Sequence, residues 1–287
     1  MAADKKEKGG PQLTHAAKPA TFEVEAYNER GEMVPTSIAG EHPLTLYLDK
    51  REIVTLMTLG HAPEALAIGY LRNQRLVDAI EDIAAVQVDW ETESVAVTTR
   101  GKKDVSGKME KRTVTTGCGQ GTVFGDLMEE IDQVRLRDDV QLTDLQLFDL
   151  IEKVRKYETI YKQAGAVHGC ALARTTGEAS AEIMMFIEDV GRHNAVDAIA
   201  GNMWLDAIEG SDKIFYTTGR LTSEMVIKCA QMRIPFLVSR SGLTQMGYDI
   251  AKRVGLTMLG RASGKHYLAF TGKERLKRTS AQPTEIA

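Results

Sequence analysis

A polar stretch of ten residues, 188–197, most constrains how this chain folds and what it binds. It holds two carboxylates, an arginine, a histidine and an asparagine around Gly191, and it directly follows the apolar residues 183–187. After it, residues 195–208 place their apolar side chains at the spacing of one helix face. The stretch is therefore predicted to be a strand-to-helix turn, a place where open α/β sheets bind ligands.

The chemistry of this turn favours an anion. Backbone amides at a helix start, together with Arg192, attract negative charge, and Gly191 lets the backbone approach a ligand closely. The alternative interpretation is a solvated loop whose Asp and Asn side chains only cap the next helix.

Composition excludes several classes of protein. The 287 residues, 43% hydrophobic and 26% charged, are ordinary for a soluble globular protein and long enough for two modest domains. No apolar run reaches the length of a membrane span, and residues 1–20 lack the apolar centre of a secretory signal. We therefore expect a cytoplasmic protein that does not bind membranes. The net charge of −4 argues against a general nucleic-acid-binding role.

Two basic stretches stand out against this acidic background. Residues 100–112 hold six basic and two acidic side chains, and residues 265–278 hold five lysines and arginines against one glutamate. Each is interpreted either as a solvated face or as a surface that steers an anionic cofactor or an acidic partner.

The order of predicted elements indicates an α+β protein with a smaller N-terminal domain rich in antiparallel strands and a C-terminal α/β domain. Hairpins are expected over residues 44–57 and 86–97, with a helix starting at Pro63 between them. The capping box that begins at Thr143 predicts a helix ending near Gly165. The expected organisation is a disordered tail (1–40), a small α+β domain (41–115), a glycine-rich cysteine loop and linker (116–141), the α/β domain (142–272) and a basic flexible tail (273–287).

Three predicted strand-to-helix junctions share one chemistry. Residues 189–192, 217–220 and 239–242 each combine glycine with an arginine and a small polar side chain. If their strands are parallel neighbours, these junctions lie on one edge of the sheet and bind the phosphates of one ligand. The alternative is that these residues are simply good turn and cap formers. No P-loop or Rossmann fingerprint is present, so ATP hydrolysis and NAD binding are not supported.

The three cysteines predict different roles. Cys118 lies between two glycines just after the first basic stretch, and exposure near positive charge favours a reactive thiolate. A surface cysteine without a role is the alternative. Cys170 and Cys229 lie among apolar residues and are predicted to be small core residues. Their wide spacing argues against a structural zinc site.

Four segments of the sequence together resemble the formate dehydrogenase accessory sulfurtransferase (FdhD) family. They are residues 188–197, residues 218–224, the glycine-flanked Cys118 and residues 255–260. The similarity spans about residues 43–270. It implies a cytidine-deaminase-like α/β fold for the C-terminal domain and a cytoplasmic homodimer.

The resemblance also implies a function. Proteins of this family take sulfur from a cysteine desulfurase and pass it to the molybdenum cofactor, bis-molybdopterin guanine dinucleotide, before the cofactor enters the formate dehydrogenase apoprotein. The persulfide-bearing cysteine of the family matches Cys118. The cofactor-binding segment of the family matches Arg261, Ala262, Ser263, Gly264, Lys265 and His266. A guanine nucleotide is expected to mimic the cofactor.

The residues themselves suggest further cofactor contacts, because a pyrophosphate binds helix N-termini and arginines. Glu188 or Asp189 is expected to accept hydrogen bonds from guanine. The other predicted contacts are Gly191, Arg192, His193, Asn194, Thr218, Gly219, Arg220 and Ser241.

Two departures from the family pattern leave alternatives open. The loop commonly has a second cysteine where this chain has Gly121, and His266 stands where arginine is frequent. Direct transfer from Cys118 is compatible with Gly121, and so is a non-catalytic chaperone that only binds and delivers the cofactor. A zinc deaminase is not supported, because the Pro-Cys-x-x-Cys ligand pair is absent.

Overall fold

A computed structural model of the chain describes residues 10–101, 113–114, 121–122, 131 and 133–279. Its contacts divide the chain into two compact units, each of which is assembled from separate parts of the sequence. Unit 1 comprises residues 1–130, 159–169 and 187–208, and unit 2 comprises residues 131–158, 170–186 and 209–287. Among the described helices, none combines the length and apolarity needed to cross a bilayer.

Unit 1 is built on a five-stranded sheet. The strand order is β1 (Gln12–Leu13), β6 (Ile83–Asp89), β7 (Ser94–Thr99), β4 (His42–Leu48) and β5 (Arg51–Thr58). The two predicted hairpins are confirmed, since β4 pairs antiparallel with β5 and β6 with β7. Buried and more exposed residues alternate along β4, as expected for a strand with one face on the core. Leu44, Leu46 and Leu48 are buried, while their neighbours in β4 are more exposed.

Two helices of unit 1 pack against each other unusually closely. α1 (Pro63–Asn73) begins at the proline that the sequence predicts for its first turn, and α6 (Arg192–Leu205) follows the polar stretch. Gly69 of α1 and Gly201 of α6 lie at the contact: a Cβ atom at Gly69 would lie 1.6 Å from the carbonyl oxygen of Asp197. Glycine at these positions allows the two backbones to meet. A single 3-10 turn, η1 (Ile80–Asp82), precedes β6.

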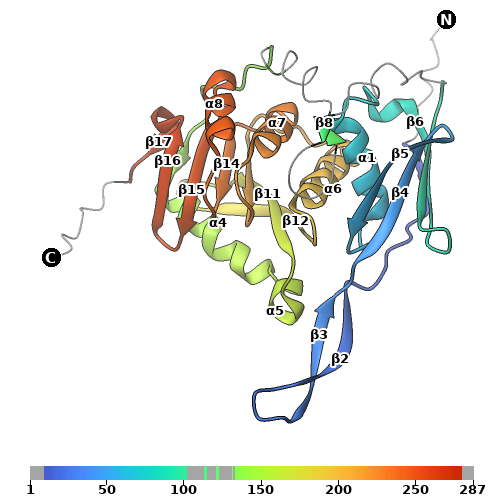
Figure 1. The fold of residues 1–287 in the computed structure, drawn as a ribbon. Helices are drawn as coiled ribbons and strands as arrows, with labels where there is room; N and C mark the ends of the chain where they lie inside the picture. The colour runs from blue at the N-terminus through green and yellow to red at the C-terminus, as the bar shows by residue number, and fades with distance from the viewer. Residues whose placement is uncertain (1–9, 102–112, 115–120, 123–130, 132, 280–287) are drawn as a thin grey trace, which may run out of the picture. The chain divides into compact units, whose positions relative to one another are not determined.

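The N-terminal segment is ordered where a disordered tail is predicted. β1 pairs with β6, and β2 (Thr21–Tyr27) forms an antiparallel hairpin with β3 (Met33–Ala39), drawn as a long blue ribbon in Figure 1. The prediction of disorder over residues 1–40 is therefore wrong for residues 12–39. The turn is stabilised by the side chain of Asn28, whose Oδ1 accepts hydrogen bonds from the amides of Arg30 and Glu32.

Unit 2 is built on a six-stranded mixed sheet. The strand order is β12 (Ala181–Asp189), β11 (His168–Thr175), β13 (Lys213–Thr217), β14 (Phe236–Ser239), β15 (Thr257–Ser263) and β16 (His266–Thr271). β13, β14 and β15 are parallel, whereas β11 and β16 pair antiparallel with β13 and β15.

Helices cover both faces of this sheet (Figure 1). α4 (Asp144–Tyr157) packs on one face, where Leu147, Leu150 and Val154 join a core with residues of β11, β13, β14 and β15. α7 (Ser223–Gln231) and α8 (Gln245–Val254) lie on the other face and contact each other. The predicted capping box is confirmed, because Thr143 Oγ1 accepts from the amide of Gln146 and Gln146 Oε1 accepts from the amide of Thr143.

The helix predicted to run to Gly165 is divided in two. α4 ends at Tyr157 and a short helix, α5 (Ile160–Ala164), follows. The amides of Thr159, Ile160 and Tyr161 donate to the carboxylate of Glu188, so they are not available to continue the hydrogen-bond ladder of α4.

The basic stretch at residues 273–279 is also ordered, although it is predicted to be a flexible tail. It contains a 3-10 turn, η2 (Lys273–Arg275), and β17 (Leu276–Lys277), which pairs with β10 (Leu142–Thr143). Arg275 is buried and donates from Nη1 to the carbonyl of Gly255 and to Oγ1 of Thr257. These contacts explain why the segment folds back on unit 2.

Short strands flank the cysteine loop. β8 (Thr113–Val114) pairs antiparallel with β9 (Gly121–Thr122). Cys118 is between them in sequence and lies outside the described residues.

The predicted α+β class is confirmed by both sheets and their helices. The contiguous boundaries 41–115 and 142–272 differ from the observed units, because residues 159–169 and 187–208 belong to unit 1. α6, which is distant from α1 in sequence, packs on that helix through two glycines and therefore belongs to unit 1.

Candidate functional site

The two carboxylates of the polar stretch at the end of β12 are buried and accept hydrogen bonds from other parts of the protein. Glu188 is 3% exposed, and its carboxylate accepts hydrogen bonds from the amides of Thr159, Ile160 and Tyr161 at 2.9–3.1 Å. The charge compensates the unpaired amides that begin α5. These three bonds involve both oxygens of the carboxylate. The expected role of Glu188 in binding guanine stays a prediction.

Asp189 is the centre of a second buried network in unit 1. Its Oδ2 accepts from Thr58 Oγ1 at 2.5 Å and from the amide of Leu59 at 3.2 Å, and its Oδ1 accepts from the amide of Gly191 at 3.0 Å and from Asn194 Nδ2 at 2.9 Å. Burial raises the pKa of Asp189, while these donors act in the opposite direction by favouring the carboxylate. The network joins the end of β5 to the start of α6.

The remaining polar residues of the stretch are also buried. Asn194 Nδ2 donates to the carbonyl of Met57 at 2.6 Å, and Asp197 Oδ1 accepts from Asn73 Nδ2 at 2.7 Å. Arg192 and His193 are 6% and 2% exposed. The hydrogen bonds of Asn194 and Asp197 stabilise the interior of unit 1. The cofactor contacts expected at Gly191, Arg192, His193 and Asn194 stay predictions.

Two of the three predicted junctions meet in unit 2. Thr217 at the end of β13 is in register with Ser239 at the end of β14, so both loops leave the same edge of the sheet. Ser239 Oγ donates to the carbonyl of Gly219 at 2.6 Å, which ties the loops together. The prediction that these junctions share an edge is confirmed for this pair, whereas the junction at Asp189 belongs to unit 1.

The segment from Arg261 to His266 adjoins this edge. The amide of Arg261 donates to the carbonyl of Ser241 at 2.9 Å, so two predicted cofactor residues are adjacent through their backbones. Ala262 is buried in the core, and Gly264 adopts a left-handed conformation with φ of 57° in the turn between β15 and β16.

Among the junction arginines, the two in unit 2 differ. Arg220 is exposed, whereas Arg240 donates from Nη1 to Oε1 of the buried Glu158 at 2.8 Å. Arg220 is therefore the better placed of the two to receive an anion.

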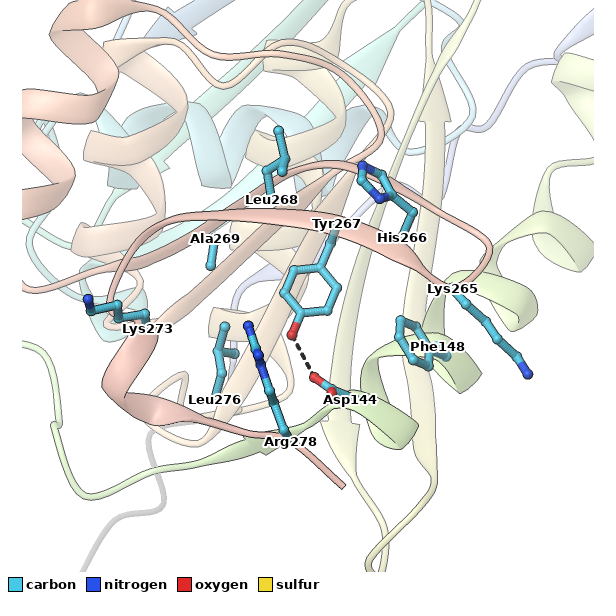
Figure 2. Close-up of a pocket in the computed structure, with 10 residues that line it drawn as sticks. All are labelled: Asp144, Phe148, Lys265, His266, Tyr267, Leu268, Ala269, Lys273, Leu276 and Arg278. Carbon is cyan, nitrogen blue, oxygen red and sulfur yellow. Dashed lines mark hydrogen bonds between the residues drawn. The ribbon is translucent and has the colours of Figure 1, made fainter. Parts of the chain in front are cut away.

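A cavity of about 490 Å³ lies along β16 (Figure 2). It combines the end of the predicted cofactor segment with α4 and the C-terminal basic stretch. Its lining residues are Asp144, Phe148, Lys265, His266, Tyr267, Leu268, Ala269, Lys273, Leu276 and Arg278. Sequence reasoning missed Phe148, Tyr267 and Asp144 as lining residues. The predicted cofactor segment, through Lys265 and His266, and the surplus of lysines and arginines in residues 265–278 pointed toward this region.

The two described cysteines are confirmed as core residues. Cys170 and Cys229 are fully buried, and Cys170 Sγ lies 3.3 Å from Thr217 Oγ1. Burial raises the pKa of Cys229 well above its usual value. Both thiols are therefore poor nucleophiles in the folded protein. Within the part of the chain that the structure describes, no three His, Cys, Asp or Glu side chains are grouped to hold a metal ion.

Comparison with known proteins gives consistent results. A protein called sulfur carrier protein FdhD from Listeria monocytogenes is 30% identical over 258 residues, covering 89% of this chain and 95% of that protein. The protein of the same name from Sulfurisphaera tokodaii is 30% identical over 255 residues, covering 87% and 95%.

A solved structure is also similar. It belongs to a protein assigned as a formate dehydrogenase accessory protein from Desulfotalea psychrophila, with 25% identity and a TM-score of 0.72, and the match covers 90% of this chain and all of that one. The sequence model of the FdhD/NarQ family matches residues 39–277. The chain therefore belongs to the FdhD/NarQ family.

Proposed function

We propose that this protein is a sulfur carrier in the maturation of formate dehydrogenase. It receives sulfur from a cysteine desulfurase as a persulfide on Cys118 and transfers it to the molybdenum cofactor before that cofactor enters the apoprotein. The observation that carries the proposal is the family match over residues 39–277, which includes Cys118, together with relatives named as sulfur carriers. The protein is accordingly expected to act as a cytoplasmic sulfurtransferase and to form a homodimer.

The thiols of the chain support Cys118 as the carrier. Cys170 and Cys229 are buried, whereas Cys118 has glycine on both sides and follows a basic stretch. Nearby positive charge stabilises a thiolate. In the proposed step, the Cys118 thiolate attacks the outer sulfur of the donor's persulfide. A new sulfur–sulfur bond forms on Cys118, the donor's sulfur–sulfur bond breaks, and the donor cysteine leaves as a thiolate.

The cargo is bis-molybdopterin guanine dinucleotide, which is anionic. Unit 2 places Thr218, Gly219 and Arg220 beside Ser241, near the N-terminal ends of α7 and α8. Helix N-termini and an exposed arginine attract phosphate. The backbone bond from Arg261 to Ser241 extends this surface into the segment that ends at Lys265 and His266. We assign cofactor binding to these residues first.

A mass measurement tests the carrier role. The purified chain is incubated with a cysteine desulfurase and cysteine, and its intact mass is compared with those of Cys118→Ala and Cys229→Ala. We expect one added sulfur that is removed by a reductant, is lost in Cys118→Ala and is retained in the Cys229→Ala control.

Other outcomes have defined meanings. If no sulfur is added, or if it is added equally to Cys118→Ala, the carrier role is wrong. The alternative is then a chaperone that binds and delivers the cofactor without carrying sulfur, an alternative that Gly121 favours because it removes a second cysteine from the loop. In that case Cys118→Ala should weaken formate dehydrogenase maturation without abolishing it.

A further inference from the structure

The hairpin of β2 and β3 has no role in the function proposed above. Apart from Ala39, it precedes the region 39–277 that matches the FdhD/NarQ family. It is a sheet of two strands that lies beside α5 (Figure 1). A sheet of two strands is only marginally stable by itself, and a further strand or a packed surface stabilises it.

Large apolar side chains are exposed on both faces of this hairpin. Phe22 and Ile38 lie opposite each other on the two strands and are 44% and 47% exposed. Tyr27 and Met33 form a second such pair near the turn, at 74% and 49% exposure. Several large apolar side chains exposed on one small element are typical of a surface that contacts another molecule.

The hydrogen-bond ladder shows which backbone groups of β2 point outward. The amide of Asn28 donates to the carbonyl of Glu32, and the amide of Gly40 donates to the carbonyl of Ala20. Hydrogen-bonded and non-hydrogen-bonded pairs alternate along an antiparallel ladder, so every second residue of β2 points its N–H and C=O groups away from β3. These residues are Thr21, Glu23, Glu25 and Tyr27. Among the described strands, only β3 pairs with β2.

The two edges of the hairpin differ. On β3, the residue opposite Glu25 is Pro35, which has no N–H to donate, and α5 contacts β3 more extensively than β2. On β2, every outward residue has both an N–H and a C=O group. An unpaired edge of this kind is a template for an added strand. β2 is therefore the edge that can accept an extended segment of another molecule.

The charge of β2 determines which kind of strand fits. Glu23 and Glu25 are exposed on one face of β2, and neither forms a salt bridge within the described part of the chain. If β2 of a second copy paired antiparallel with this edge, the registers of longest overlap would place these glutamates opposite each other or opposite themselves. Like charges directly opposite each other destabilise a sheet. A second copy is therefore disfavoured, whereas basic side chains at alternate positions of a partner strand are favoured.

The other face of β2 defines the remaining positions of the partner strand. Side chains alternate along a strand, so Phe22, Val24 and Ala26 share the face opposite to that of the two glutamates. A strand added beside β2 would place every second side chain next to these apolar residues. The partner strand that fits both faces alternates basic and apolar side chains.

We propose that the outward edge of β2 binds an extended segment of a partner protein in which lysine or arginine alternates with apolar residues. The backbone of this segment pairs with the outward N–H and C=O groups of β2, and its basic side chains pair with Glu23 and Glu25. The binding site lies within unit 1 and includes neither Cys118 nor any predicted cofactor contact. It therefore adds a protein-binding surface to the sulfur-carrier role and does not depend on that role.

A synthetic peptide in which valine and lysine alternate is the probe for this edge. It has seven residues, the length of β2, and carries a fluorescent label. A second labelled peptide has the same composition with its lysines placed together, so it keeps the charge but loses the alternation. Fluorescence anisotropy measures the dissociation constant of each peptide for the full-length chain. The alternating peptide should bind more tightly than the second peptide.

Three variants separate the charge of β2 from its backbone pairing. Glu25→Gln should weaken binding of the alternating peptide about two- to fivefold, the effect of one cross-strand ion pair. Glu25→Pro also removes an outward N–H while leaving the ladder with β3 complete, and it should weaken binding about tenfold. The control is Glu29→Gln, which removes an exposed charge from the turn of the same hairpin and should bind as the wild type does. Thermal unfolding of each variant checks that the chain is folded.

Several results would overturn the proposal. The wild type could bind neither peptide or bind both equally, or Glu29→Gln could weaken binding as much as Glu25→Gln. Equal binding by folded Glu25→Pro and Glu25→Gln would show that the backbone of β2 does not pair with the peptide. If Glu25→Pro does not fold, the two peptides and Glu25→Gln still decide the question.

Sedimentation velocity tests the second copy as the occupant of this edge. The oligomeric state of the wild type should be unchanged in folded Glu25→Pro. A dimer that this variant converts to a monomer would show that a second copy occupies the edge, and the proposal would then be wrong. The sulfur gained by Cys118 tests the carrier role separately, because none of these variants alters the cysteines.

Discussion

The hydroxyl of Thr58 donates a 2.5 Å hydrogen bond to Oδ2 of Asp189, a residue 131 positions later in the chain. Both side chains are buried, at 2% and 4% exposure. The bond ties the last residue of β5 to the polar stretch that precedes α6. Asp189 is therefore part of the framework of unit 1, and its predicted contact with guanine stays a prediction.

Replacing Thr58 by valine tests this framework. The variant keeps the shape of the side chain but removes a donor from a buried carboxylate, so the free energy of unfolding should fall by about 1–3 kcal/mol. Urea unfolding of the wild type and the variant measures the change. Thr55→Val is the matched control, because Thr55 is an exposed residue of the same strand and should change stability little. Equal effects of the two substitutions would show that the bond to Asp189 contributes nothing.

The decrease in the free energy of unfolding caused by Thr58→Val should also depend on pH. Burial raises the pKa of Asp189, so the folded state binds the proton more tightly than the unfolded chain. The contribution of Asp189 to stability is complete below the unfolded pKa and is lost as pH rises through the folded pKa. The Thr58 hydroxyl stabilises the ionised form, so its removal should cost more near neutral pH than in mild acid. Unfolding measured at both pH values should show this increase, and a cost that falls toward neutral pH would contradict it.

The contact between α1 and α6 predicts an unusual response to alanine. Within a helix, replacing glycine by alanine ordinarily stabilises by roughly 0.5–1 kcal/mol. At Gly69 the added Cβ atom would meet the carbonyl oxygen of Asp197 at 1.6 Å, and at Gly201 it would meet that of Ala65 at 1.9 Å. We expect Gly69→Ala to destabilise by about 1–3 kcal/mol or more, because the helices must separate.

Chemical unfolding of Gly69→Ala measures this change. Gly242→Ala serves as the control, since no atom lies within 4 Å of its added Cβ and its φ is not in the left-handed region. An unchanged or increased stability of Gly69→Ala would mean that the two helices do not pack at this glycine.

Local patterns predicted much of this fold. The capping box at Thr143, the proline that begins α1 and the alternation in β4 each depend on residues close in sequence, and the structure confirms them. β2 and β3 also alternate, around a turn that Asn28 stabilises, so their hairpin was detectable. It was missed because its apolar residues are few and partly exposed.

Long-range partners explain what the sequence did not reveal at the site. The internal partners of Asp189 and Glu188, which are Thr58 and the amides at the start of α5, are distant from them in sequence and could not be predicted. The adjacency of Arg261 and Ser241 follows from the pairing of β14 with β15, which periodicity alone cannot give. The cavity is lined by residues of α4, β16 and residues 273–278, and no local sequence motif predicts that these three segments come together.

Two arginines of the C-terminal stretch should respond differently to substitution. Arg275→Gln removes two hydrogen bonds that hold residues 273–279 on unit 2, and we expect it to lower the free energy of unfolding by about 1–3 kcal/mol. Arg278→Gln alters an exposed side chain and should leave the unfolding transition unchanged. Thermal unfolding of both variants separates these roles. Loss of stability in Arg278→Gln would instead place that residue in the folding framework.

The thiols of the native protein should differ sharply in reactivity. Cys170 and Cys229 are fully buried, and the raised pKa of Cys229 keeps it protonated at neutral pH. Iodoacetamide should therefore modify the native chain rapidly at one position, Cys118, and modify all three cysteines only after denaturation. Intact mass after short labelling measures the number of modified thiols, and peptide mapping identifies them. Cys118→Ala should take up no label in the same period. Rapid labelling of Cys229 in the native variant would show that the core of unit 2 opens readily, and the assignment of sulfur to Cys118 would then need Cys229→Ala as a background.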